Sequence, residues 1–257
     1  MKTWPLISAT ALACSLSAHA ADAPDDGGPA VVPYRPSVST PAQLSAPGYL
    51  ELEAGGLRAS DSGASRTSLP YTLKLAFTPD WGIRIGGDAW VRDRAFGLSD
   101  SGVGDTAVVL KHRFAVSDAT AWGLELGETF PTAKSSIGAG HAATTVNGIF
   151  SSDFAPAWHT DINLNLTRLG GSDQPSPWQT GWAAAFSRTL TDAWGAVGEL
   201  SGTHQSGAAN TAQFLAAVSW NQSPAAVFDF GFARGLNDAT PRWQVFGGVT
   251  VRLGKVF

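Results

Sequence analysis

Cysteine is almost absent from this chain of 257 residues, since Cys14 is its only copy. Cys14 lies in an N-terminal stretch that processing is expected to remove, and the mature chain would then contain no thiol. The absence of thiols excludes disulfides, thiolate metal sites and cysteine nucleophiles. Lipidation is not predicted, because Ala11-Leu12-Ala13-Cys14 puts leucine in the wrong place for a lipoprotein cleavage site. A chain of this length can bury a core without covalent cross-links.

Charge and long apolar runs are scarce as well. Charged residues make up 15% of the chain and give a formal net charge of −4, whereas soluble domains contain about 25% charged residues. The mean hydropathy is close to zero, yet no apolar run beyond the N-terminus approaches the ~18 residues of a transmembrane helix. A helical membrane protein is therefore excluded. Lysine and arginine are scattered singly, so no nucleic acid partner is predicted.

The first 20 residues have the three parts of a secretory signal peptide. Lys2 supplies the positive charge, residues 4–16 are mostly apolar, and Ala18-His19-Ala20 matches the small-x-small cleavage pattern. The apolar part is shorter than the ~20 residues that span a bilayer. We therefore expect residues 1–20 to be removed and the chain to be secreted.

Residues 21–46 differ in composition from the rest of the chain. Prolines at positions 24, 29, 33, 36 and 41, with a further one at 47, exclude regular strand pairing over most of this stretch. We interpret residues 21–46 as an extended segment that lies in the periplasm or enters the lumen of a barrel formed by residues 47–257. Two roles stay open for it: a gate inside the lumen, or a disordered leader that contacts chaperones.

From residue 49 onward, apolar and polar side chains alternate in runs of about ten residues, the pattern of strands in a transmembrane barrel. In residues 69–77, for example, the odd positions hold leucine, tyrosine, leucine, leucine and phenylalanine. Such runs lie near residues 48–57, 69–78, 82–92, 104–114, 121–130, 144–153, 158–168, 178–189, 194–202, 211–221, 226–235 and 242–253. The predicted fold class is an all-β, antiparallel transmembrane β-barrel of about 12 strands.

The connections between these runs alternate in length. Short turns are predicted near residues 79–80, 117–119, 155–157, 191–193 and 223–224, and longer links near 58–68, 93–103, 131–143, 170–177, 203–210 and 236–241. Short periplasmic turns and longer outer loops are typical of bacterial barrels, whereas a soluble β-sandwich has no reason to separate them. The expected location is the outer membrane of a Gram-negative bacterium.

Tryptophans collect beside the short turns. Aromatic rings with one polar edge favour the headgroup level of a membrane. The residues assigned to this membrane interface are Trp81, Trp122, Trp158, Trp194, Trp220 and the C-terminal Phe257. A C-terminal aromatic that closes an alternating strand resembles the signal by which bacterial barrels are recognised for insertion. The expected partners are therefore outer-membrane lipid and the barrel-insertion machinery.

Short segments from residue 35 to the end of the chain share a specific order and spacing. They are RPSVSTP (35–41), PGYLELEAG (47–55), TPDWGIRIG (78–86), GVGDT (102–106), KHRF (111–114), FPT (130–132), LTDAW (190–194) and ARGLNDATP (233–241). Together they resemble the outer-membrane transporter family named for the MetA pathway of phenol degradation. The resemblance implies an outer-membrane barrel that moves small, often aromatic, hydrophobic compounds. It implies no catalytic residues.

If the apolar positions of each strand face lipid, the opposite positions face the lumen and carry most of the charges. These positions hold Glu51, Glu53, Lys74, Arg84, Asp88, Arg92, Asp105, Lys111, Arg113, Glu125, Asp161, Glu199, Asp229 and Arg252. The best candidates for lining a solute pathway lie on adjacent strands and are Arg84, Asp88, Arg92, Lys111 and Arg113. The alternative is that the charges pair across the lumen and close it, because their signs are mixed and a narrow barrel desolvates unpaired charges.

An outer-membrane hydrolase would need a serine and a histidine close together at the lipid face or the rim. His112 has no evident serine partner, and Ser201 and Ser206 near His204 are weak support in a serine-rich chain. The histidines show no metal-ligand spacing, and no glycine-rich phosphate loop is present. The predicted function is a porin-like channel or transporter for small, aromatic or hydrophobic solutes, without catalytic residues, metal or cofactor. A lipid-acting barrel enzyme and a structural or adhesion barrel are the alternatives.

Overall fold

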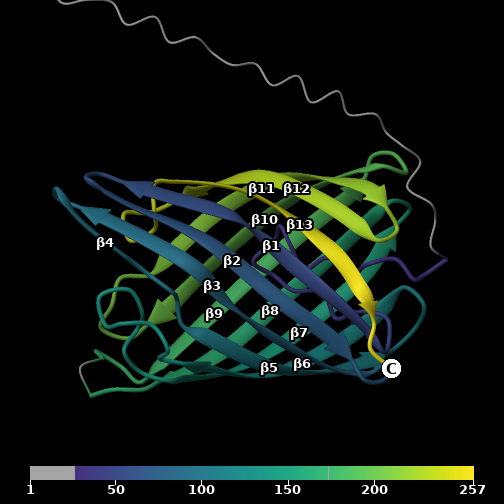
Figure 1. The fold of residues 1–257 in the computed structure, drawn as a ribbon, viewed down its shortest axis with the longest axis horizontal. Coiled ribbons are helices and arrows are strands. Elements are labelled where there is room, and N and C mark those ends of the chain that lie inside the picture. Colours follow the sequence, from purple (N-terminus) through teal and green to yellow (C-terminus); the bar gives the residue numbers. More distant parts are fainter. Residues whose placement is uncertain (1–26, 173) are drawn as a thin grey trace, which may run out of the picture.

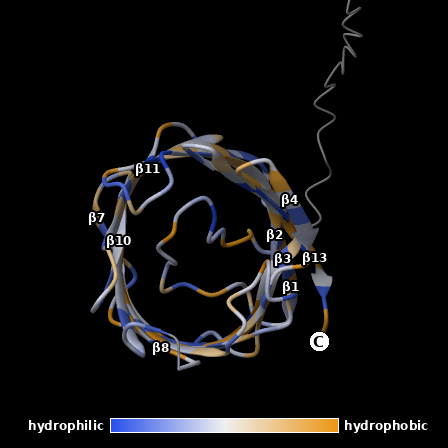
Figure 2. Cartoon of the chain, turned by 90° about the vertical axis from the view of Figure 1, so that its left-hand side faces the viewer, coloured by the Kyte–Doolittle hydropathy of each residue, from blue (hydrophilic) through white to orange (hydrophobic). Residues whose placement is uncertain are grey.

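The computed structural model describes residues 27–172 and 174–257, and these residues form a closed β-barrel (Figure 1, Figure 2). The wall contains β1 (Tyr49–Asp61), β2 (Ala64–Ala76), β3 (Trp81–Ala95), β4 (Leu98–Gly102), β5 (Thr106–Ala115), β6 (Thr120–Phe130), β7 (Ala143–Ala155), β8 (Trp158–Leu169), β9 (Trp178–Thr189), β10 (Trp194–Gln205), β11 (Thr211–Ser223), β12 (Ala226–Gly235) and β13 (Trp243–Lys255). No helix occurs among the described residues, so none of them forms a membrane-spanning helix. The predicted signal peptide, residues 1–20, lies outside the described residues.

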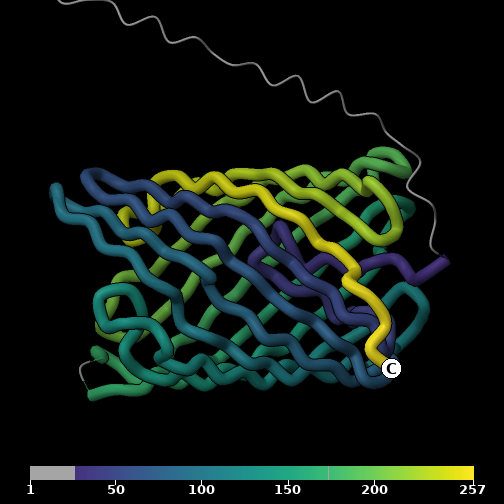
Figure 3. Tube along the Cα trace, in the orientation of Figure 1, coloured from purple at the N-terminus to yellow at the C-terminus, as the bar shows by residue number. Residues whose placement is uncertain are grey.

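All strand pairs are antiparallel, and the pairing of β1 with β13 closes the sheet. Both β4 and β5 pair with β3, β4 along residues 91–95 and β5 along residues 81–87. These two short strands share one position in the wall, so the barrel is twelve strands in circumference. The predicted class, an antiparallel barrel of twelve strands, is confirmed. The tube in Figure 3 shows how strongly the strands tilt against the barrel axis.

The alternation that predicted the strands separates the two surfaces of the wall. In β12, Phe228, Phe230 and Phe232 are exposed, whereas Asp229 and Gly231 between them are buried. Large exposed apolar side chains occur on each of the other long strands of the wall except β1. Leaving such a side chain in water forfeits about 1.5–3 kcal/mol. An apolar exterior of this kind is the outer band of a transmembrane barrel.

The six aromatic residues assigned to the membrane interface are 38% to 61% exposed. Trp81, Trp158 and Trp194 each begin a strand and therefore lie beside a short turn. The rings of Trp194 and Trp220 stack with their centroids 6.3 Å apart. Residues at a membrane interface need exposed rings near the ends of the strands. These residues meet that requirement, and their interface role stays a prediction.

Two of the predicted loops are mostly strand. Residues 58–68 and 93–103 belong to the hairpins β1–β2 and β3–β4, which turn at Gly63 and Gly97. These glycines have φ of +79° and +84°, a backbone conformation that lets an antiparallel chain reverse within two residues. The strands on either side are rich in serine and arginine. Because apolar and polar side chains do not alternate in them, their composition alone predicted a loop. Figure 1 shows both hairpins extending beyond the neighbouring wall.

A bulge in β3 changes which side of the wall each residue faces from Val91 onward. Ser68 pairs with Val91 but Pro70 pairs with Asp88, so β3 holds one extra residue between these two pairs. Val91 is fully buried on the lumen side, and Arg92 beside it is exposed. The prediction that Arg92 lines the lumen is therefore wrong, because the extra residue shifts the period-two alternation by one position.

Asp100 on β4 holds the loop that connects β6 to β7. Lys134 donates to one oxygen of its carboxylate, and Ser136 Oγ donates to the other at 2.5 Å. The hydrogen bonds from Lys134 and Ser136 hold the pKa of Asp100 at about 2, below its ordinary value of 3.8. Because docking lowers this pKa, the contribution of Asp100 to the attachment is complete above the ordinary value and is lost as the pH falls toward the lower one.

We predict that residues 131–142 are docked most firmly at neutral pH and lose amide protection as the pH falls from 3.8 to about 2. Amide hydrogen exchange of this loop against pH, corrected for the intrinsic exchange rate, measures the change. Asp100→Asn should expose the loop already at neutral pH, whereas Asp118→Asn in the exposed β5–β6 turn should not. Equal protection of the loop above and below this pH range would contradict the prediction.

Candidate functional site

Residues 27–48 form a loop inside the barrel, and we call them the lumen segment. Val31 N donates to Pro224 O and Gly48 N donates to Ala76 O, both at 2.9 Å. Pro224 and Ala76 lie at the short turns, so the segment meets the wall twice at the same end of the barrel. Between these points it loops into the lumen and returns, as Figure 2 shows in the view along the barrel.

Three wall glutamates accept hydrogen bonds from the backbone of the lumen segment. The pairs are Val32 N with Glu51 at 3.3 Å, Tyr34 N with Glu53 at 2.7 Å, and Ser39 N with Glu199 at 2.9 Å. The three carboxylates are at most 4% exposed. Hydrogen bonds to a charged acceptor are roughly twice as strong as neutral ones. Buried backbone N–H groups need a hydrogen-bond acceptor. The lumen segment has no neighbouring strand to supply one, and these carboxylates take its place.

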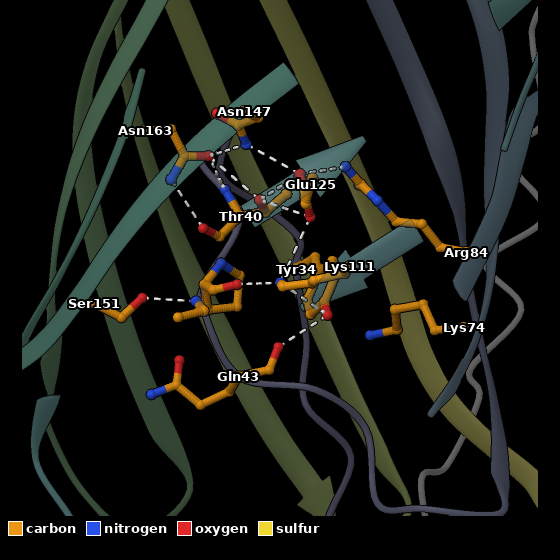
Figure 4. A network of polar contacts seen from close by, with 12 residues as sticks. Tyr34, Thr40, Gln43, Lys74, Arg84, Lys111, Glu125, Asn147, Ser151 and Asn163 are labelled. Carbon is orange, nitrogen blue, oxygen red and sulfur yellow. Dashed lines mark hydrogen bonds and ion pairs between the residues drawn. The ribbon is translucent and has the colours of Figure 1, made fainter. Parts of the chain in front are cut away.

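Neutral wall side chains hold the middle of the lumen segment. Asn163 accepts from Thr40 N and donates to Thr40 O, each at 2.9 Å. Ser151 Oγ accepts from Ala42 N at 2.7 Å. An asparagine that binds both backbone groups of one residue replaces a neighbouring strand, so it fixes the position of the segment along the barrel. Figure 4 shows these contacts beside Glu125.

Tyr34 lies between two lysines of the wall (Figure 4). The Nζ atoms of Lys74 and Lys111 lie 4.3 and 4.2 Å from the centroid of its ring. Its hydroxyl donates to Gln43 O at 2.9 Å. Burial raises the pKa of Tyr34 far above its ordinary value, so the phenol stays neutral and keeps its donor proton. Two desolvated cations on one ring favour a single placement of this side chain.

Glu125 is the centre of the polar network in Figure 4. Arg84 Nη2 and Asn147 Nδ2 each lie 3.0 Å from its carboxylate, and Lys111 Nζ lies 3.6 Å from it. Arg84 Nε is buried and has no hydrogen-bond partner among the described residues. The Arg84 side chain as a whole is 25% exposed, so the accessible part of its guanidinium can bind an acceptor group of a solute at this point.

Arg35 reaches the junction of the first and last strands. Its Nε and Nη2 donate to Asp229 at 2.9 and 3.0 Å. A Cβ atom at Gly55 of β1 would lie 2.9 Å from this guanidinium, and one at Gly248 of β13 would lie 2.7 Å from it. Glycine at these two positions therefore leaves the space through which Arg35 extends.

Four of the five residues predicted to line a pathway lie on the lumen side, and Arg92 does not. Their acidic or basic partners are Glu125 for Arg84 and Lys111, Arg66 for Asp88, and Asp80 for Arg113. The contacts of Asp88 and Arg113 are long, at 3.8 Å each. Each of the four is thus paired with an opposite charge. Their role in conduction stays a prediction.

The lumen segment divides the interior into two cavities. The inner cavity, of about 690 Å³, lies toward the short turns and borders Ser39 and Pro41. The outer cavity, of about 430 Å³, lies toward the longer loops and borders Val38 and Thr40. Residues 38–41 therefore form the partition between them.

Sequence reasoning missed several residues of this site. Arg66, 2.8 Å from Asp93, was in a stretch predicted as a loop. Arg35 lies in the lumen segment, for which no contacts were predicted. Asn147 and Asn163 are uncharged and were left out of the lumen-side charges. Counting amides together with charges on the same side of each strand would have found both asparagines.

The histidines considered for an enzyme lie apart from serine. The His112 ring packs on Trp81 with the centroids 4.2 Å apart, and its Nδ1 lies 3.0 Å from Asp80 O. His204 Nδ1 pairs with Asn210 Oδ1 at 2.7 Å. Within the described ranges, neither histidine hydrogen-bonds a serine, and no cluster of three His, Cys, Asp or Glu side chains could hold a metal ion.

No protein-family model and no curated protein matches the chain. Several solved structures share its fold. The COG4313 outer membrane channel from Pseudomonas putida F1 superposes with a TM-score of 0.67 at 12% identity, over 82% of this chain and 98% of that chain. The NanC porin (TM-score 0.58, 9% identity) and the KdgM porin (0.56, 7%) each match 79% of this chain and 99% of their own. At these identities the similarity establishes the fold.

Proposed function

We propose that this chain is an outer-membrane channel for small solutes and that the lumen segment is its gate. The observation that carries the proposal is the partition: residues 38–41 separate two cavities that would otherwise form one passage. The apolar exterior supports a place in a membrane, and the predicted signal peptide supports export to the outer membrane of a Gram-negative bacterium. An outer membrane channel and two porins share its fold.

A gate has to be held firmly and yet be released. The lumen segment meets the wall mainly through hydrogen bonds and ion pairs, and only a small apolar cluster joins Ala42 to Ala121 and Ile149. Water can replace polar contacts of this kind, so each contributes only about 0.5–1.5 kcal/mol net, or about 1.5–3 kcal/mol where the acceptor is charged. The segment can therefore leave the lumen without losing a large apolar core.

The outer cavity favours solutes with an apolar body and one hydrogen-bonding group, such as phenols and aromatic acids. Asn147, Asn163 and Arg84 line it and offer amide groups and a partly exposed guanidinium. Val38 presents an apolar side chain that is 54% exposed in the same cavity. This chemistry agrees with the substrates implied by the resemblance to transporters of the MetA pathway. We propose solutes of this class for the channel.

A reversible disulfide tests the gate. Ala42→Cys with Ser151→Cys joins the lumen segment to β7, where Ala42 N and Ser151 Oγ are 2.7 Å apart, in a mature chain predicted to have no other thiol. We expect single-channel conductance in a planar bilayer to fall on oxidation and to recover on reduction. Phenol should change the current of the reduced form. Each single-cysteine variant, treated with the same oxidant, is the control.

Equal conductance of the oxidised and reduced double variant, with the disulfide verified by mass, would overturn the gate. A folded barrel that never conducts, reduced and with phenol present, would overturn the channel itself.

A further inference from the structure

The outer parts of β1–β4 carry a polar patch on the outside of the barrel. Residues that pair directly across an antiparallel sheet point to the same side. Two cross-strand rows cover this surface. They are Arg58, Thr67, Arg92 and Ser101, and then Ser60, Ser65, Arg94 and Ser99. All eight side chains are arginine, serine or threonine, without a carboxylate or an apolar group. We call this set the arginine patch.

The outward direction of the arginine patch follows from its neighbours in sequence. Val91 is fully buried, and Arg66 pairs with the lumen-side Asp93. Successive side chains of a strand alternate between the two faces. Arg92 and Thr67, each one residue further along its strand, therefore lie on the outside of the wall.

The arginines of the patch lack carboxylate partners. Arg58 Nη1 donates to Thr67 Oγ1 at 3.5 Å, and Arg92 Nε donates to Ser99 Oγ at 3.1 Å. In the part of the chain that the structure describes, neither these two nor Arg94 forms an ion pair. Four lumen-side arginines differ, since each of them pairs with a carboxylate: Arg35, Arg66, Arg84 and Arg113. Three exposed cations without counter-charges are thus concentrated on β1 and β3, on either side of β2.

The height of the patch matches a membrane surface. Trp81 begins β3 at the short-turn end, and Arg92 lies eleven residues further along the same strand. At about 3.3 Å per residue and a tilt of about 40°, this separation is roughly 25–28 Å along the membrane normal. The apolar band of outer-membrane barrels is about 25 Å tall. Arg92 and Arg94 therefore lie at the headgroup level of the leaflet on the long-loop side.

We propose that the arginine patch binds the phosphate groups of the glycolipid that forms the outer leaflet. Guanidinium groups bind phosphate through two parallel charge-assisted hydrogen bonds. The serine and threonine hydroxyls between them donate to the remaining phosphate and sugar oxygens. Exposed Leu69 and Trp90 border the patch on its membrane side, so acyl chains of the same lipid have an apolar surface to contact. The proposal rests on the proposed outer-membrane location and is independent of the gate.

Native mass spectrometry of the mature chain, refolded in a neutral detergent, tests the proposal with diphosphorylated lipid A as probe. The test variant is Arg58→Gln/Arg92→Gln/Arg94→Gln. The matched control is Arg168→Gln/Arg188→Gln/Arg234→Gln, which removes the same charge from outward positions of β8, β9 and β12. We expect the affinity for lipid A to fall about tenfold or more in the test variant and to stay near the wild-type value in the control.

Three results would overturn the proposal. They are equal losses in both variants, unchanged binding in the test variant, and equal binding of dephosphorylated lipid A by the wild type. Retention of inorganic phosphate without lipid would indicate a solute site and would also overturn it. Heat-dependent electrophoretic mobility checks that each barrel is folded, and Arg92→Gln alone repeats the test if the triple variant does not fold. Conductance in neutral bilayers is measured in parallel, so a failure of the channel proposal is seen separately.

Discussion

Deletion of residues 27–46 is expected to raise the single-channel conductance on the order of tenfold. Eight-strand barrels are filled by their own side chains and sixteen-strand barrels leave a water-filled channel. A twelve-strand barrel without its lumen segment therefore has an open passage of intermediate width. Planar-bilayer recordings of the refolded deletion variant, beside the full mature chain, measure the effect.

A glycine–serine linker of equal length in place of residues 27–46 is the control for this deletion. It keeps the chain volume near the lumen but lacks the side chains of Arg35 and Tyr34, which contact Asp229 and Lys111 of the wall. We expect this variant to conduct as well, with a noisier current, because nothing fixes the linker in place. Conductance of the deletion variant at the level of the full chain would show that the lumen segment does not obstruct the passage.

Lys74→Met is expected to lower the free energy of unfolding by about 3–5 kcal/mol, the cost of leaving buried charge without its partner. Lys74 Nζ lies 3.0 Å from Glu51 and 2.6 Å from Glu53, and it also donates to Val32 O. All three charged side chains are at most 5% exposed. Methionine fills a similar volume and leaves two carboxylates without a cation. Urea unfolding in lipid vesicles, followed by tryptophan fluorescence, measures the loss.

Two further variants separate charge from packing. Adding Glu51→Gln and Glu53→Gln to Lys74→Met removes the remaining buried charges and should restore much of the stability. Lys134→Met breaks the solvent-exposed pair with Asp100 and should leave the free energy of unfolding close to that of the wild type. A small loss in Lys74→Met, or a triple variant no more stable than Lys74→Met, would contradict the prediction.

The strands were predictable because the membrane imposes a strict alternation on them. Residues 178–189 and 226–235, for example, are strands with the predicted bounds. The hairpins β1–β2 and β3–β4 extend past the apolar exterior, where no lipid selects apolar side chains. Their serines and arginines are compatible with a strand but show no alternation of apolar and polar side chains. Residues 58–68 and 93–103 were therefore predicted as loops.

The site was predictable in its residue types but less so in its contacts. Alternation placed Arg84, Lys111 and Glu125 on the lumen side, and the structure joins them in one network. A single extra residue in β3 was invisible to alternation, and it turned Arg92 outward. The partners in the lumen segment depend on the path of an irregular chain through three dimensions. No local sequence pattern in residues 27–48 predicts the hydrogen bonds between Thr40 and Asn163.

Arg35 also bears on how the barrel is assembled. It binds Asp229 and extends past Gly55 and Gly248, so its binding place is made from strands near both ends of the chain. An unclosed sheet keeps β1 and β13 apart and offers no such place. Arg35 can therefore occupy this place only when the wall closes or afterwards. Arg35 thus acts as an internal latch on the strand pair that joins the two ends of the wall.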